Sequence, residues 1–142
     1  MKTIPHFILI DDEPIINVIS TMIIEDVFEG ADIRPFTNPE KGFEYLSSFE
    51  GHSAALSETI LFLDINMPRM TGWQFMLQYI QLKERVKNKI KVFFLSSSID
   101  RRDKIRALNT PNVIDYLEKP LTPEKLVAIV LSSVSVKNKL IV

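Results

Sequence analysis

Cysteine is absent from this chain of 142 residues, which excludes disulfides, thiolate metal sites and cysteine nucleophiles. Glycine is scarce, and none of the four glycines forms part of a Walker or dinucleotide-binding loop. The two histidines, His6 and His52, are isolated in the sequence, so we interpret them as surface residues rather than catalysts. No apolar run approaches the roughly 20 residues of a membrane span, and the first apolar run is too short for a signal peptide.

Neither sign of charge is in excess, because 17 Lys and Arg residues stand against 18 Asp and Glu residues, for a net charge of −1. This balance gives no indication of attraction to nucleic acid or insertion into a membrane, and we expect neither. The hydrophobic content of 46% and the charged content of 25% are typical of a soluble globular protein. The length suits one domain over residues 1–142, and the lack of cysteine fits a cytoplasmic location.

Short apolar runs alternate with segments of helical periodicity along the whole chain. The predicted strands are residues 7–10, 31–36, 60–63, 91–95 and 113–117, and the predicted helices are residues 14–27, 38–49, 73–86, 100–108 and 122–134. The residues that we expect to face the core from the first and fourth helices are Ile16, Ile19, Ile23, Val27, Ile105 and Leu108.

Five strands that alternate with helices imply a doubly wound α/β domain. The second and fifth strands carry charged residues, and the second also contains Pro35, so both are predicted edge strands. This favours the flavodoxin-like (βα)5 arrangement, a five-stranded parallel sheet in the order 2-1-3-4-5. Ligands of such sheets bind beyond the carboxyl ends of the strands, here between the first and third strands.

Acidic residues follow the two strands that flank this switch point, with Asp11 and Asp12 after the first and Asp64 after the third. Unit charges ~4 Å apart repel by about 4 kcal/mol at an effective dielectric near 20, so three clustered acids raise one another's pKa values or recruit a cation. Oxygen ligands suit Mg²⁺, and the lack of histidine at these strand ends disfavours zinc. The acids after the first strand could instead only cap a helix, but that leaves Asp64 unexplained.

Three further positions on the same edge have both an ordinary and a functional interpretation. Lys119, before Pro120, is either a solvated loop residue or a cation for phosphate, and the bond between these two residues can be cis. The serines 96–98 end the fourth strand, where one of them is expected to cap a helix and one hydroxyl could donate to a phosphoryl oxygen. Tyr116 lies among apolar residues, where an aromatic side chain is usually simple packing.

These residues together resemble the receiver domain of two-component response regulators, in particular the chemotaxis-type receivers that consist of one domain. The resemblance is carried by Asp11-Asp12, the segment Asp64-Ile-Asn-Met-Pro-Arg-Met-Thr-Gly72, the Ser97 position and Lys119-Pro120. It extends over nearly the whole chain. The chain departs from the usual pattern in a longer connection over residues 51–59 and in Asn-Thr-Pro-Asn at residues 109–112.

The resemblance implies that Asp64 accepts a phosphoryl group from a histidine kinase or a histidine phosphotransfer protein. It also implies that Asp11, Asp12 and Asp64 bind Mg²⁺ as the cofactor, with the backbone carbonyl of Asn66 as a further ligand. Lys119 would pair with a phosphoryl oxygen.

The resemblance assigns a switch role to two residues near the last strands. Ser97 would hydrogen-bond the phosphoryl group, and Ser97 is preferred over Ser96 because Asp103 then occupies the acidic position that the family usually has in the following helix. Tyr116, three residues before Lys119, matches the aromatic switch position. The implied chemistry is self-phosphorylation with weak autophosphatase activity, not that of a conventional enzyme.

We expect a stand-alone receiver, since the last helix nearly exhausts the chain, that acts on an unidentified downstream protein. A fragment of a larger regulator and a phosphorelay intermediate are the alternatives. A homodimer through the 100–108 helix, the 113–117 strand and the last helix is also expected to be possible. A phosphohydrolase is disfavoured because Asn66 stands where a second acid is usual, and intact acids argue against an interaction domain that is never phosphorylated.

Overall fold

The computed structural model describes the backbone of residues 4–52 and 55–141 and the side chains in these ranges up to residue 132. Its centre is a five-stranded parallel sheet in the order β2-β1-β3-β4-β5. This confirms the predicted fold class and strand order. The strands are β1 (His6–Ile10), β2 (Ile33–Phe36), β3 (Thr59–Leu63), β4 (Ile90–Ser96) and β5 (Val113–Glu118).

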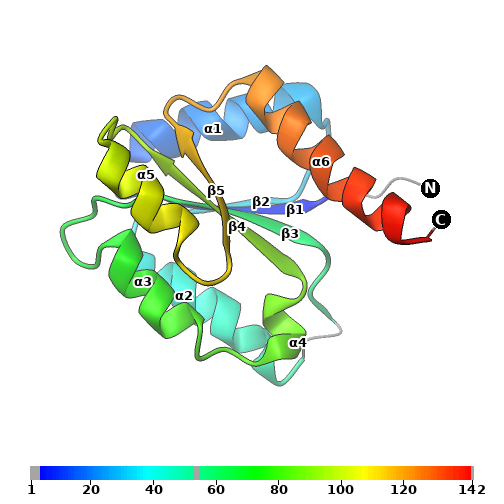
Figure 1. Ribbon diagram of the computed structural model, residues 1–142, viewed down its shortest axis with the longest axis horizontal. Coiled ribbons are helices and arrows are strands. Elements are labelled where there is room, and N and C mark those ends of the chain that lie inside the picture. Colours follow the sequence, from blue (N-terminus) through cyan, green and yellow to red (C-terminus); the bar gives the residue numbers. More distant parts are fainter. Residues whose placement is uncertain (1–3, 53–54, 142) are drawn as a thin grey trace.

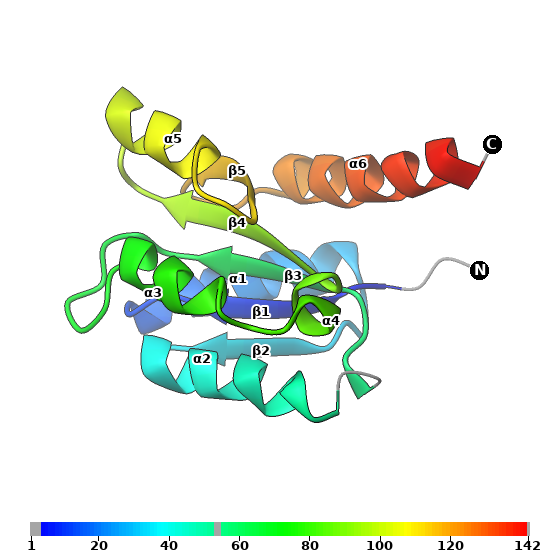
Figure 2. The same ribbon diagram turned by 60° about the horizontal axis from the view of Figure 1, so that its bottom comes forward.

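Helices cover both faces of the sheet (Figure 1). One face is covered by α1 (Pro14–Val27) and α6 (Pro123–Ile141), and the other by α2 (Pro39–Ser47), α3 (Gly72–Tyr79) and α5 (Arg101–Leu108). The short elements η1 (Ser48–Glu50) and α4 (Glu84–Lys87) lie on the α2 and α3 side. The turned view brings this side forward and shows α3 and α4 in front of the central strands (Figure 2).

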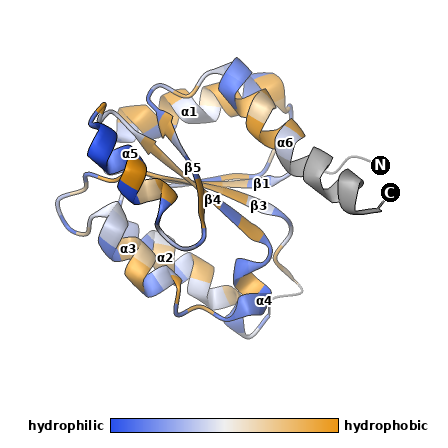
Figure 3. Ribbon diagram, viewed as in Figure 1, coloured by the Kyte–Doolittle hydropathy of each residue, from blue (hydrophilic) through white to orange (hydrophobic). Residues whose placement is uncertain are grey.

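The core has two halves because successive residues of a strand point to opposite faces of the sheet. In β1, Phe7 and Leu9 pack with α1 and α6, while Ile8 and Ile10 pack with α2 and α3. Both β1 and β3 are buried along their whole length, whereas β2 and β5 are partly exposed as edge strands. The hydrophobic colours along the central strands in Figure 3 follow this arrangement, which is the one expected of a parallel sheet covered on both faces.

Of the residues predicted to face the core from α1, Ile23 and Val27 pack against it, whereas the prediction for Ile19 is wrong. Ile19 is 40% exposed, and Ile16, Ile23 and Val27 are only half-buried. The fully buried residues of the helix are Asn17, Ser20 and Ile24. Polar residues occupy this face because the Asn17 side chain donates to backbone carbonyls at the carboxyl end of the sheet.

Two further helix predictions need correction. The predicted 73–86 helix is two helices, α3 and α4, because residues 80–83 form a turn in which Leu82 is buried. In α5, the predicted inward residues Ile105 and Leu108 are about half exposed, at 51% and 49%, and Ala107 is the buried residue. The small Ala107 side chain lets α5 pack closely on β5, which turns the larger side chains outward.

His6 is buried, so its interpretation as a surface residue is wrong. Its Nδ1 lies 3.2 Å from an Asp32 carboxylate oxygen, and its Nε2 lies 3.3 Å from the Tyr45 hydroxyl. Burial lowers the pKa of His6, although the Asp32 charge opposes this effect. His6 begins β1, so this cluster lies at the opposite end of the strand from Asp11.

Candidate functional site

Three carboxylates meet at the carboxyl end of the sheet. Ile10 and Leu63 are neighbours in the parallel pairing of β1 with β3, so the next residues, Asp11 and Asp64, emerge side by side. Oxygens of Asp11, Asp12 and Asp64 lie within 4.8 Å of one another. Asp11 and Asp64 are buried, and Asp12 is half-buried. The residues that the sequence predicts for a cation site are therefore brought together by strand pairing.

Lys119 reaches the same cluster from the end of β5. Its Nζ lies 2.7 Å from an Asp11 oxygen and 3.4 Å from an Asp64 oxygen, and its side chain is 9% exposed. The Lys119 backbone N–H donates to the Ser96 carbonyl at 2.8 Å, and its bond to Pro120 is cis. The ammonium group therefore occupies a fixed position next to two buried carboxylates.

The electrostatics of the site favour a bound cation. Burial, and then the neighbouring Asp11 charge, raise the pKa of Asp64 to about 6, against the opposing effect of Lys119. Burial by itself lowers the pKa of Lys119, but its hydrogen bond to Asp11 and the Asp64 charge outweigh this and raise it. Three acids and one lysine leave uncompensated negative charge, and carboxylate oxygens suit Mg²⁺ better than soft metals. The donor set therefore fits the magnesium ion that receiver domains bind.

The loop after β1 is held by hydrogen bonds that the sequence analysis missed. An Asp11 carboxylate oxygen accepts the Glu13 N–H at 3.0 Å. The Asn17 side chain donates to the Asp11 carbonyl at 3.2 Å and to the Phe36 carbonyl at 3.1 Å. Asn17 is a positioning residue, since it ties α1 and the end of β2 to the acidic loop. Its only sequence signal is a polar residue near the start of an apolar helix.

The loop after β3 is held against the start of α3. The Gly72 N–H donates to the Ile65 carbonyl at 2.8 Å, and Thr71 and Gln74 form a reciprocal capping box. Asn66 is exposed in the intervening loop. The role of its carbonyl as a metal ligand stays a prediction.

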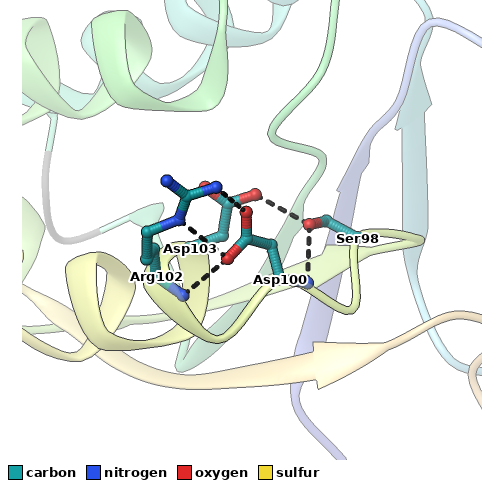
Figure 4. A network of polar contacts seen from close by, with 4 residues as sticks. All are labelled: Ser98, Asp100, Arg102 and Asp103. Carbon is teal, nitrogen blue, oxygen red and sulfur yellow. Dashed lines mark hydrogen bonds and ion pairs between the residues drawn. The ribbon is translucent and has the colours of Figure 1, made fainter.

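The three serines after β4 have different environments. Ser96 ends β4 and is fully buried, whereas Ser97 is exposed just beyond the strand. The Ser98 hydroxyl donates to Asp103 at 2.7 Å and accepts the Asp100 N–H at 3.2 Å (Figure 4). The N-cap of α5 is Asp100 rather than a serine, so that part of the prediction is wrong.

Tyr116 points into the molecule from β5. The residue is 6% exposed within the core cluster that contains Ala107, and its hydroxyl donates to the Ser98 carbonyl. Tyr116 therefore packs in the core and also holds the loop between β4 and α5. The predicted switch roles of Tyr116 and Ser97 stay predictions.

Comparisons with known proteins agree with this geometry. Residues 7–131 match the response regulator receiver domain family. A two-component response regulator from Cytophaga hutchinsonii is 31% identical, with a TM-score of 0.83, 94% of this chain and 99% of that chain covered. A response regulator receiver protein from Dyadobacter fermentans is 27% identical, with a TM-score of 0.79, 87% of this chain and 92% of that chain covered.

A more distant solved structure shows the same fold. The chemotaxis protein CheY4 of Vibrio cholerae is 18% identical, with a TM-score of 0.68, 92% of this chain and 98% of that chain covered. A comparison with curated protein sequences finds no match. In the part of the chain that the structure describes, none of the helices has the length and apolar character needed to cross a membrane. On the family match and the geometry of its acidic cluster, the chain belongs to the response regulator receiver domain family, the phosphoacceptor module of two-component signalling.

Proposed function

We propose that this chain is a single-domain response regulator whose phosphoacceptor is Asp64 and whose cofactor is Mg²⁺. The observation that carries the proposal is the buried Asp64 carboxylate with a raised pKa, next to Lys119 and two further acids. The donor would be a histidine kinase or a histidine phosphotransfer protein, in the cytoplasm.

In the proposed transfer, an Asp64 carboxylate oxygen forms a bond to the donor's phosphorus while the phosphorus–nitrogen bond of the phosphohistidine breaks. The electron pair of that bond stays on the imidazole nitrogen, and Asp64 becomes an acyl phosphate. Lys119 balances charge on the phosphoryl oxygens. A magnesium ion held by Asp11, Asp12, Asp64 and the Asn66 carbonyl would supply further positive charge there. In the weak autophosphatase step, a water oxygen would later bond to the phosphorus while the bond from phosphorus to the Asp64 oxygen breaks, which releases inorganic phosphate and restores the carboxylate.

The signal would be a shift between two populations of the loop after β4. A phosphoryl group adds negative charge and three acceptor oxygens, which a serine hydroxyl at this end of the sheet can bind. Ser97 is the serine that the sequence favours. Ser96 is the stronger candidate on geometry, because it is buried, its carbonyl accepts the Lys119 N–H, and it lies two residues after Phe94 on the face where Tyr116 packs.

Exposed aliphatic side chains support two protein contacts in this proposal. α1 begins directly after the acidic loop and presents Ile15, Val18 and Met22, exposed by more than half, for a phosphodonor. The outer side of α5 and β5 presents Ile105, Leu108 and Ile114. This second surface supports either the predicted homodimer or contact with a downstream protein. Sedimentation before and after phosphorylation distinguishes the two, because only the homodimer doubles the mass of the isolated chain.

The test of the proposed function is treatment with acetyl phosphate and Mg²⁺, followed by intact mass measurement. We expect one phosphoryl group on the unaltered chain, none on Asp64→Asn, and none when EDTA removes Mg²⁺. Asp26→Asn is the matched control, since Asp26 is an exposed acid on α1, and we expect it to be labelled normally. Full Mg²⁺-dependent labelling of Asp64→Asn would contradict the assignment.

A further inference from the structure

A groove between α3 and α5 has no part in the proposed phosphotransfer. Its volume is about 290 Å³, and it lies between the exposed side of α3 and the end of α5. Leu77, on the side of α3 that faces away from the core, is exposed at this groove to 67%. Residues from both helices and from the turn after α5 line it, among them Trp73, Met76, Leu77, Ile80, Arg106 and Pro111.

The charge around the groove has one sign. The α3 segment, Gly-Trp-Gln-Phe-Met-Leu-Gln-Tyr, contains no charged residue, and Arg106 is the charged residue in the lining. Arg102 lies one turn before Arg106 on the same helix, but its charge is balanced by Asp100, with which it forms an ion pair. The nearby acids of α5 are engaged elsewhere, because Asp100 pairs with Arg102 and Asp103 accepts a hydrogen bond from Ser98. The groove is therefore apolar with a basic side.

Arg106 is held in place but retains donors for a ligand. Its guanidinium lies 4.1 Å from the centre of the Trp73 ring, a cation–π contact that fixes its plane. Among the residues that the structure describes, no carboxylate pairs with Arg106. A guanidinium carries five N–H donors in a fork that matches a carboxylate. The group is thus suited to an incoming acid.

We propose that this groove binds a short helical segment of a partner protein that presents a large apolar side chain beside an acidic one. The apolar side chain would cover Leu77 and Ile80, and the carboxylate would pair with Arg106. The basic side argues against a second copy of the chain, since two such grooves facing each other would bring like charges together. The apolar floor and the net charge of −1 argue against nucleic acid.

The two walls of the groove connect to the acidic cluster. α3 begins at Gly72, beside the Asp64 carbonyl, and the Trp73 ring packs on Phe94 with ring centres 5.0 Å apart. On the other wall, Asp103 holds α5 to Ser98 after β4. Phosphorylation would therefore change how well the partner helix fits the groove. This effect rests on the proposed function, whereas binding of the helix to the groove does not.

The test is selection of displayed peptides of 12–16 residues, about four helical turns, on the full chain. We expect the enriched peptides to combine Leu, Phe or Met with Glu or Asp, and to lose about tenfold or more in affinity against Leu77→Glu and against Arg106→Glu. Lys104→Glu is the matched control, because it makes the same charge change on the opposite side of α5, and it should leave affinity unchanged. Trp73 is the chain's only tryptophan, so its fluorescence reports binding at this position.

A charge exchange makes the test specific. Peptides whose acids are replaced by lysine should not bind the unaltered chain and should bind Arg106→Glu. Circular dichroism of each variant excludes unfolding as the cause. The proposal is overturned if the enriched peptides are basic or purely apolar, or if the groove variants do not lower their affinity. It is also overturned if selection on the unaltered chain enriches no peptide relative to selection on the Leu77→Glu, Arg106→Glu double variant. Self-association abolished by Leu77→Glu would overturn it in favour of a dimer.

Labelling by acetyl phosphate separates this proposal from the proposed function. The groove variants should be labelled at the normal rate, since neither residue contacts the acids. Binding of acidic peptides by a chain that is never phosphorylated would support the groove proposal and contradict the assignment of Asp64 as phosphoacceptor. Phosphorylation of a chain that binds no such peptide would support the assignment of Asp64 and contradict the groove proposal.

Discussion

Gly72 lies so close to the Asp64 backbone that a Cβ atom at Gly72 would stand 2.6 Å from the Asp64 carbonyl oxygen. The Ile65 Cα would be only 3.0 Å away, and backbone atoms cannot move aside as a flexible side chain can. The absence of a side chain at Gly72 thus lets α3 approach the loop that carries Asp64.

Gly72→Ala should lower the free energy of unfolding by about 1–3 kcal/mol, since inserted methyl groups in tight sites cost that much. It should also slow acetyl phosphate labelling, because either α3 or the Asp64 loop must shift. Gly51→Ala is the control and should be close to neutral, since among the described residues none beyond its chain neighbours lies within 4 Å of its Cβ. Urea unfolding measures both variants, and equal stabilities would contradict the argument.

Asp64 should make the protein less stable as the pH rises, when no divalent cation is present. Its pKa is about 6 in the folded chain against 3.8 for the free side chain, so the folded state binds the proton more tightly. The free energy of unfolding should therefore fall between about pH 4 and pH 6, by up to about 3 kcal/mol from this group.

Asp64→Asn should lack that contribution, so it should match the unaltered chain near pH 4 and exceed its stability at pH 7. The measurement is urea unfolding in EDTA across this range, with Asp26→Asn as the control. Mg²⁺ should then stabilise the unaltered chain more than Asp64→Asn. If the free energy of unfolding of the two proteins changed equally with pH, ionisation of Asp64 would not be the cause of the loss of stability.

Removal of the Lys119 cation should leave the buried acids uncompensated. Lys119→Met should lower the free energy of unfolding at pH 7 by about 3 kcal/mol in EDTA, tighten Mg²⁺ binding and slow labelling by acetyl phosphate. Lys125→Met is the matched control, because the Lys125 ammonium donates to the backbone carbonyls of Glu118 and Pro120 and pairs with no carboxylate among the described side chains. Calorimetric titration with Mg²⁺ is the direct measurement, and unchanged affinity would count against the ion pair geometry.

The proposed contact between a serine and the phosphoryl group can be tested, and assigned to Ser96 or Ser97, by a pair of alanine variants. Ser96→Ala should remove most of the phosphorylation-dependent change in Tyr116 environment while leaving labelling intact. Ser97→Ala should have little effect, because that side chain is exposed. Fluorine NMR of fluorotyrosine-labelled protein measures the change, and the opposite result would restore the sequence prediction of Ser97.

The aliphatic surface of α1 should affect the rate of phosphoryl transfer from a protein donor but not from a small-molecule donor. Ile15→Gln should slow transfer from a histidine kinase by about tenfold or more, the loss expected from about 1.5–3 kcal/mol of apolar burial. Its labelling by acetyl phosphate should be unchanged. Ile4→Gln is the control, an exposed isoleucine before β1 at the far end of the sheet. Equal slowing of both reactions would point to damage at the acids instead.

Strand order and the acidic cluster were predictable because both depend on local patterns. Buried parallel strands appear as apolar runs, and polar residues at their carboxyl ends meet at one edge whatever the packing details. The side of each helix that faces the sheet was less predictable. Asn17 and Ala107 face the sheet through hydrogen bonding and close approach, which helical periodicity alone does not encode. His6 was misjudged for the same reason, since its partners Asp32 and Tyr45 lie on other elements.

The amino-acid sequence by itself determined the alternation of strands and helices, the order of the sheet and the identity of the acids and the lysine. Tertiary structure alone decided which serine is buried at the end of β4, how close Lys119 comes to each carboxylate, and that α3 and α5 leave a basic apolar groove between them. Local patterns follow from backbone geometry and burial within one segment, whereas these features depend on the distance between side chains that only packing brings together.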